Sequence, residues 1–114
     1  MTTLRTCSRR GNGTSEPVAT FETAHRFDSD RKKLTDTQHA RFVRVVREQF
    51  VPDLDGGRFR PSLRVKGVQG RSGVFEMTWA PDGRATWTFG EQQREGVTHV
   101  IWRRVGTHDI LRDP

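Results

Sequence analysis

The stretch VFEMTWAPDGRATWTF, residues 74–89, decides the fold that we predict from the sequence. On each side of its centre, apolar and polar residues alternate, which is typical of a β-strand with one buried face. The central Ala-Pro-Asp-Gly, residues 80–83, is typical of a tight turn, because proline presets φ and Gly83 accepts a positive φ. The stretch therefore predicts a hairpin with a threonine-rich face and an aromatic core face that contains Trp79 and Trp87.

An amphipathic helix is predicted upstream of this hairpin. Residues 35–38, Thr-Asp-Thr-Gln, match the capping box, in which the hydroxyl and the glutamine each satisfy a free backbone amide. Pro52 and the glycine pair at 56–57 are expected to end the helix. Its apolar positions recur at spacings of three and four, at Val43, Val46, Phe50 and Leu54. This pattern predicts a helix that packs on a flat surface.

The remaining segments complete an α+β domain. Residues 18–21 predict a short strand, 24–34 a first helix and 97–105 a last strand. Gly106 is expected to end that strand, and Thr107 to cap a short terminal helical turn. The order is β-α-α-β-β-β, with two N-terminal helices packed on one face of a twisted, mostly antiparallel sheet. The other sheet face is expected to be polar, basic and available.

Composition limits the class of protein. The chain has 114 residues, enough for one domain, and a net charge of +6, which favours nucleic acid as a partner over a merely arginine-rich surface. No apolar run is long enough for a membrane span or a signal peptide, so we expect a cytoplasmic protein. The single cysteine excludes an internal disulfide and a multi-cysteine zinc site. We expect residues 1–17 to be a disordered basic leader and 18–114 to be the domain.

A basic segment lies between the predicted helix and the hairpin. No acidic residue occurs between Gly56 and Phe75, so its cations are uncompensated within the segment. Guanidinium groups bind phosphate oxygens in pairs, and the segment is therefore either a phosphate track or a solvated basic loop. Its five cations are Arg58, Arg60, Arg64, Lys66 and Arg71.

Among the four histidines, His108 is the candidate for chemistry. It follows a predicted strand end and two arginines, Arg103 and Arg104, and an imidazole beside fixed cations suits phosphodiester chemistry near neutral pH. His99 lies within the last strand and is expected to be packed or hydrogen-bonded. The histidines at 25 and 39 are expected on the surface, and no spacing fits a metal site.

Two further side chains are candidates for contacts with a nucleic acid. Trp102 is the tryptophan that we expect to be exposed, where it could stack on a base. Arg84 begins the second hairpin strand, where it either serves a phosphate or pairs with Asp82 across the turn.

Four segments of the chain resemble the RelE/ParE superfamily of bacterial toxins, and the Gly-Thr-His ending is most similar to its RelE-type, YafQ-like branch. The resemblance covers residues 18–111 and includes the order and spacing of the segments. They are LRVKGVQG at 63–70, GVFEM at 73–77, PDGR at 81–84 and RVGTHDIL at 104–111.

The resemblance implies the toxin of a type II toxin–antitoxin system. Such a toxin would cut mRNA on the ribosome by attack of a 2′-hydroxyl on the adjacent phosphate, without metal or cofactor, and a cognate antitoxin would restrain it. His108 would be the acid or base, Arg84 would steady the phosphorane charge, and Lys66 and Asp82 would lie near the site. The residues expected to bind RNA are Arg58, Arg60, Arg64, Arg71, Arg103, Arg104 and Trp102.

The chain also departs from the RelE pattern. Glu76 and Thr78 stand where RelE has lysines on the first hairpin strand, and the chain has no tyrosine. Glu76 could be a general base, or it could mark the loss of the lysine-based mechanism. Two alternatives therefore remain open. One is a non-catalytic module that binds RNA or protein, and the other is a ParE-like inhibitor of gyrase.

Overall fold

The computed structural model describes residues 2–3, 7–8 and 17–114. The described strands form one mixed sheet in the order β1-β3-β7-β6-β5-β4, with β2 beside β3. Only the β3–β7 pair is parallel among these strands; the other pairs are antiparallel. The strands are β1 (Thr2–Thr3), β2 (Cys7–Ser8), β3 (Pro17–Thr23), β4 (Lys66–Gly67), β5 (Val74–Thr78), β6 (Gly83–Arg94) and β7 (Val97–Thr107).

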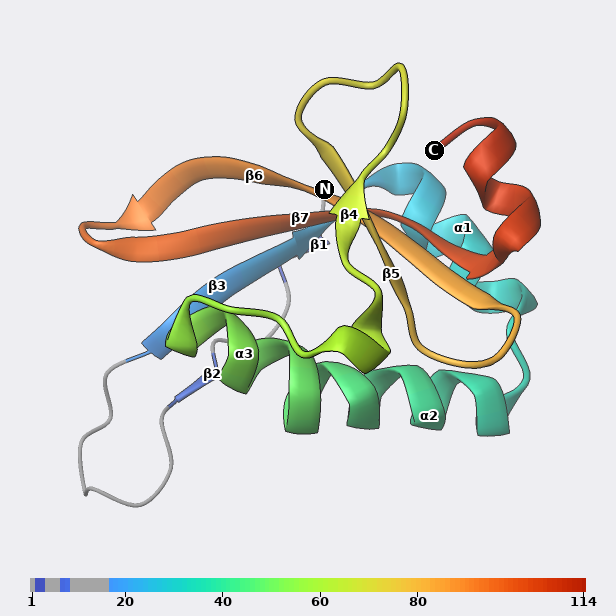
Figure 1. Ribbon diagram of the computed structural model, residues 1–114, viewed down its shortest axis with the longest axis horizontal. Coiled ribbons are helices and arrows are strands. Elements are labelled where there is room, and N and C mark those ends of the chain that lie inside the picture. Colours follow the sequence, from blue (N-terminus) through green and yellow to red (C-terminus); the bar gives the residue numbers. More distant parts are fainter. Residues whose placement is uncertain (1, 4–6, 9–16) are drawn as a thin grey trace.

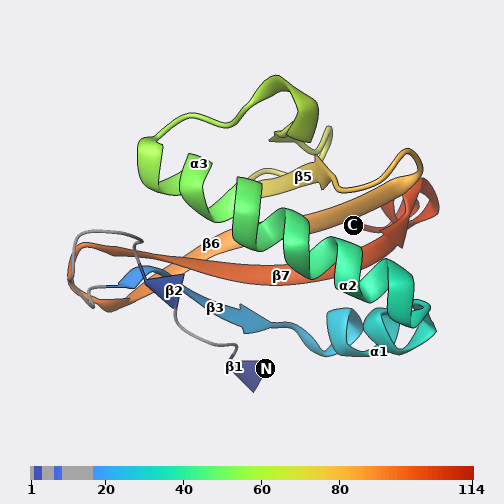
Figure 2. The same ribbon diagram turned by 90° about the horizontal axis from the view of Figure 1, so that it is seen from below.

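Helices cover one face of this sheet (Figures 1 and 2). None of the described helices has the length and apolarity that crossing a membrane requires. The predicted α+β class, with two helical segments before a twisted sheet, is confirmed. The helical segments are α1 (His25–Lys33), α2 (Asp36–Val45), the π-turn η1 (Val46–Phe50), α3 (Val51–Gly56) and the 3₁₀ turns η2 (Pro61–Leu63) and η3 (His108–Arg112).

The second helix starts as predicted but does not end at its proline. At its start, the backbone amide of Gln38 donates to the hydroxyl of Thr35, and the amide of Thr35 donates to the side chain of Gln38, which confirms the capping box. In the π-turn, the amide of Val51 donates to the carbonyl of Val46. The wider turn places Pro52 in the first turn of α3, where its missing N–H is not needed. The helix therefore continues to Gly56.

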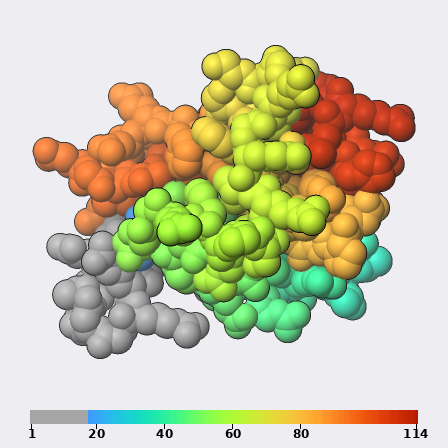
Figure 3. All heavy atoms as spheres, in the orientation of Figure 1, coloured from blue at the N-terminus to red at the C-terminus, as the bar shows by residue number. Residues whose placement is uncertain are grey.

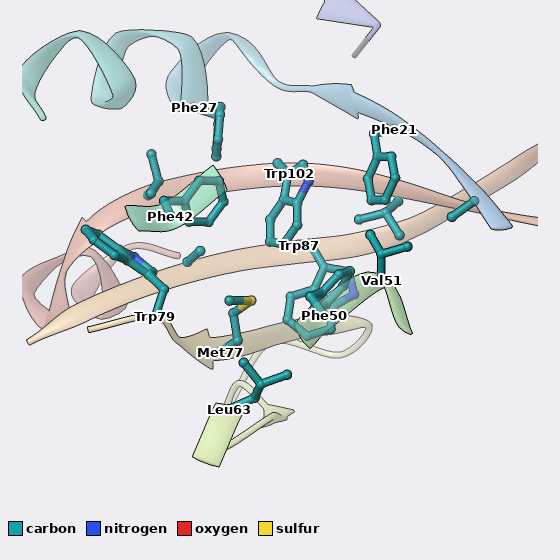
Figure 4. Close-up of a cluster of buried hydrophobic side chains, with 14 residues drawn as sticks. Phe21, Phe27, Phe42, Phe50, Val51, Leu63, Met77, Trp79, Trp87 and Trp102 are labelled. Carbon is teal, nitrogen blue, oxygen red and sulfur yellow. The ribbon is translucent and has the colours of Figure 1, made fainter. Parts of the chain in front are cut away.

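An aromatic core joins the helices to the sheet (Figure 4). Trp102 is 1% exposed and packs against Phe42, Phe50 and Trp87, with ring centroids 5.0–5.7 Å apart. The prediction of an exposed, base-stacking Trp102 is therefore wrong. The physical reason is the register, because Trp102 and Trp87 are direct partners on neighbouring strands and so share the core face.

Two glycines differ from their expected roles. Gly83 does not have a positive φ. It is instead packed so closely that a Cβ there would lie 2.6 Å from the ring of Trp79. Gly106 does not end the last strand, since β7 continues to Thr107. Thr107 does cap η3, because its hydroxyl accepts from the amide of Asp109. The hairpin turn therefore requires glycine at position 83 for space rather than for backbone freedom.

The N-terminal residues that the structure describes lie beside β3. Thr2–Thr3 and Cys7–Ser8 pair with that strand in antiparallel register, where we expected a disordered leader. Residues 1, 4–6 and 9–16, which make up most of the predicted leader, lie outside the described residues.

The sheet face turned away from the helices is polar, as expected, but it is neither fully open nor basic. Glu76, Thr86 and His99 on this face are all less than 9% exposed. Two of its side chains are acidic: Glu76 lies beside Lys66 of β4, and Glu22 lies beside His99. The expectation of an available basic face is therefore wrong for the centre of the sheet.

Candidate active site

The candidate site lies where the hairpin turn meets the end of the last strand. Gly83 pairs with Thr107 across β6 and β7, so the turn residue Asp82 is brought to His108, the first residue of η3. His108 Nδ1 lies 2.6 Å from Asp82 Oδ1, and the two side chains are 63% and 64% exposed. The structure thus unites two predicted residues that are 26 positions apart.

This contact favours the ionised form of Asp82 and orients the ring of His108. The hydrogen bond from His108 lowers the pKa of Asp82, and the positive charges of His108 and Arg84 lower that pKa further. Because an ionised carboxylate only accepts hydrogen bonds, Asp82 holds the proton of His108 on Nδ1. The Nε2 atom on the far side of the ring is therefore the one that can exchange a proton with a ligand.

Arg84 lies on the same turn, where backbone carbonyls hold its side chain. Its Nη1 atom lies 3.0 Å from the carbonyl oxygen of Gly83 and 3.3 Å from that of Pro81. These contacts, rather than a salt bridge to Asp82, fix the guanidinium. The result is a fixed positive charge beside the Asp82–His108 pair.

Glu76 and Lys66 form a second group on the neighbouring strands. Their side chains lie 3.8 Å apart across β4 and β5, and Glu76 is buried whereas the side chain of Lys66 is 70% exposed. The next residue in this row of the sheet is Thr86, whose buried hydroxyl has no hydrogen-bond partner among the described residues. No hydrogen bond or ion pair within residues 17–114 joins this group to His108. The predicted catalytic residues therefore form two groups.

The basic segment after α3 is partly neutralised by an acid from outside it. Arg60 makes two side-chain hydrogen bonds to Asp53, at 2.8 and 2.9 Å, which raises the pKa of Arg60 and lowers that of Asp53. The expectation of five uncompensated cations is therefore wrong for Arg60, and it is also wrong for Lys66 and Arg71, which pair with Glu76 and Asp113. Arg58 and Arg64 are exposed and have no ion pair within the part of the chain that the structure describes. Arg71, Arg103 and Arg104 lie elsewhere, at the C-terminal residues.

A cavity of about 700 Å³ opens between the α1–α2 junction, the hairpin turn and the start of η3. Asp82 and Asp109 line it on the side of His108, and Lys33 and Arg41 line it on the helix side. Neither of these cations has an ion pair within the described part of the chain. Sequence reasoning missed both, because a cation on a helix has the same pattern whether it faces solvent or a cavity.

His99 is confirmed as a packed, hydrogen-bonded residue. It is 3% exposed, with Nδ1 2.7 Å from the hydroxyl of Thr20 and Nε2 2.5 Å from Glu22. In the described residues, no group of three or more His, Cys, Asp or Glu side chains is placed to hold a metal ion.

These features define the class: a small α+β domain with an exposed histidine–carboxylate pair and a fixed arginine at one end of its sheet. No protein-family model and no curated protein matches the sequence. Solved structures do match. The chain superposes on a chain of the E. coli DinJ-YafQ toxin-antitoxin complex with a TM-score of 0.55 and 14% identity, over 82% of this chain and 97% of that one.

Two structures from Helicobacter pylori are also similar. A copper-bound mutant toxin gives a TM-score of 0.55 at 17% identity, over 78% of this chain and 93% of that one. A conserved hypothetical protein gives 0.56 at 22% identity, over 82% and 98%. The chain therefore has the fold of the RelE-type, YafQ-like toxins, as the sequence predicted.

Proposed function

We propose that this protein is the toxin of a type II toxin–antitoxin system and that it cuts mRNA on the ribosome. The observation that carries the proposal is the exposed Asp82–His108 pair beside Arg84, at the end of the sheet of a YafQ-like fold. A histidine whose ring is oriented by a carboxylate can act as a general acid or base near neutral pH. Its proposed substrate and partner are mRNA in the ribosome and a cognate antitoxin. The proposed location is the cytoplasm.

The proposed reaction needs only side chains of this chain. The ribose 2′-oxygen forms a bond to the adjacent phosphorus, and the bond from phosphorus to the 5′-oxygen breaks. His108 Nε2 exchanges a proton with the reacting oxygens, and Asp82 holds the opposite side of the ring in place. The products are a 2′,3′-cyclic phosphate and a 5′-hydroxyl. Arg84 stabilises the negative charge that develops on the phosphoryl oxygens, as preorganised cations do.

Glu76 is proposed as the second proton-transfer group. It lies on the same sheet, 3.8 Å from the ammonium of Lys66, and its proposed role is to accept the proton of the 2′-hydroxyl while His108 supplies one to the leaving oxygen. Arg58 and Arg64 are exposed without ion partners among the described residues, which suits contacts to the RNA backbone.

Primer extension on a defined mRNA in a purified translation reaction tests the proposal. New 5′ ends at codon-phased positions, present only when ribosomes are added, are the expected result. A matched control is His25→Gln, which removes an exposed histidine on α1 and should cut as the wild type does. An intact message at protein concentrations that saturate the ribosomes would contradict the nuclease.

One observation favours a non-catalytic RNA-binding module as the second candidate. The Nη1 atom of Arg84 donates hydrogen bonds to the carbonyl oxygens of its own turn, as in an arginine that stabilises a turn. This candidate predicts RNA binding that weakens steeply with salt and no new 5′ ends in the same assay.

A further inference from the structure

Four arginines converge on the last two residues of the chain. Two of them hold the carboxylate of Asp113: Arg26 from α1 at 2.9 Å and Arg71 from the loop after β4 at 3.1 Å. The other two, from β7, hold backbone oxygens. Arg104 Nη1 donates to the carbonyl of Asp113 at 2.9 Å, and Arg103 Nε donates to the carbonyl oxygen of Pro114 at 3.1 Å.

The arrangement resembles the way in which arginines bind a phosphate. Guanidinium groups recognise carboxylates and phosphates through the same fork of donors, so one anion can replace the other. The charges of Arg26 and Arg71 lower the pKa of Asp113, which stabilises the ionised carboxylate between the two guanidinium groups. Of the four arginines, Arg104 is the least able to bind a further anion, because Asp30 already binds its Nε and Nη2 atoms.

The contacts are exposed and can therefore be exchanged. The side chains of Arg26, Arg71 and Asp113 are 50%, 47% and 58% exposed. Ion pairs at such exposure contribute little net stability, because solvent screens them and long side chains lose freedom when they pair. A polyanion that offers several phosphates gains more from these arginines than a single carboxylate does.

The arginine group lies close to the candidate active site. One turn, η3, leads from His108 to Arg112, and Asp113 follows it. At about 2 Å per residue, this turn separates His108 from Asp113 by roughly 10 Å. Figures 1 and 3 show the C-terminal residues beside the loop after β4, on the side of the sheet away from α2. A single strand of RNA bound at His108 can therefore reach the arginines.

We propose that Arg26 and Arg71 form a phosphate site for single-stranded RNA, and that the carboxylate of Asp113 occupies this site until RNA displaces it. The inference rests on the proposed function in naming RNA as the ligand. It goes beyond that function in two ways. Arg26, which lies on α1 and not in the basic segment, becomes an RNA-binding residue, and Asp113 competes with the substrate for the arginines.

The experiment measures binding of the full chain to a fluorescent, fully 2′-O-methylated oligoribonucleotide, which cannot be cleaved by 2′-oxygen attack. Asp113→Asn removes the competing charge, and we expect Kd to fall about 3- to 10-fold. Glu95→Gln is the control, because it changes the net charge equally at the exposed β6–β7 turn. It should change Kd less than 2-fold, the small effect expected from long-range charge alone.

Salt dependence distinguishes direct phosphate contact from a general charge effect. Each new phosphate contact adds about 0.7 to the slope of log K against log salt for a single strand. Asp113→Asn should therefore steepen the slope, and Glu95→Gln should not. Adding Arg26→Gln and Arg71→Gln to Asp113→Asn should abolish the gain. Equal effects of Asp113→Asn and Glu95→Gln on Kd and slope would overturn the inference.

The outcome separates this inference from the nuclease proposal. If the wild type cuts mRNA and Asp113→Asn binds the oligonucleotide no better than the control, the phosphate site is wrong and the nuclease stands. If Asp113→Asn gains affinity through Arg26 and Arg71 while mRNA stays intact, the phosphate site stands and the nuclease is wrong. Melting curves of each variant confirm that these changes leave the fold intact.

Discussion

Two histidines near opposite ends of β7 are each hydrogen-bonded to a carboxylate, but they differ in exposure. His99 lies between Thr20 and Glu22 and is 3% exposed, whereas the side chain of His108 is 63% exposed. Both ring nitrogens of His99 have partners inside the protein. His108 uses Nδ1 for Asp82, whereas its Nε2 makes no hydrogen bond within the described residues and has Asp109 Oδ1 3.8 Å away. The same imidazole–carboxylate contact is therefore structural when it is buried and suited to catalysis when one ring nitrogen stays accessible.

The largest expected effect is on catalysis at His108. His108→Gln should reduce mRNA cleavage about 10²- to 10⁴-fold, because it removes a proton-transfer group. The melting temperature should change little, since the side chain is exposed. Primer extension and a thermal melt of the same preparation measure the two quantities. A variant that cuts at the wild-type rate would contradict the assignment of His108.

The opposite result is expected at His99. His99→Ala should lower the free energy of unfolding by about 2–4 kcal/mol, because it leaves a cavity and removes the partners of Thr20 and Glu22. Denaturant unfolding measures this loss. Cleavage per folded molecule should be unchanged, and a selective loss of cleavage in fully folded His99→Ala would break the distinction between the two histidines.

A smaller effect on cleavage is expected at Asp82. Asp82→Asn preserves the shape of the side chain but removes the charge that holds the proton on Nδ1 of His108, so cleavage should fall about 10- to 100-fold. Glu95→Gln is the matched control, since it also neutralises one exposed carboxylate but lies at the β6–β7 turn, at the other end of these strands from His108.

The smallest expected effect is on acid stability. The pKa of Asp82 is lowered in the folded chain, chiefly by the hydrogen bond from His108, so its ionised form favours folding at neutral pH. This contribution is present above the unfolded pKa of about 3.9 and is lost as pH falls through the lower folded value. The stability difference between wild type and Asp82→Asn should therefore shrink between pH 5 and pH 2, as denaturant unfolding at both pH values would measure. A stability difference between the two proteins that stays constant from pH 5 to pH 2 would contradict this prediction.

Local sequence patterns predicted the elements but not the side-chain partners between them. The capping box at Thr35 and the hairpin at 74–89 depend on neighbouring residues, so each was visible in the sequence. The pairing of Asp82 with His108 depends on the register of β6 and β7, which only the folded sheet defines. Asp82 and His108 were both candidates, but the sequence did not predict their contact.

The sequence by itself determined the order of the main helices and strands, the aromatic core face and the candidate histidine, because these follow from periodicity and short motifs. The tertiary structure decided which polar groups are accessible. It buried Trp102 and His99, paired Arg60 with Asp53 and brought Arg26 and Arg71 to Asp113. The physical reason is that burial and ion pairing depend on distances between segments far apart in the chain, and those distances exist only after the sheet and helices have packed.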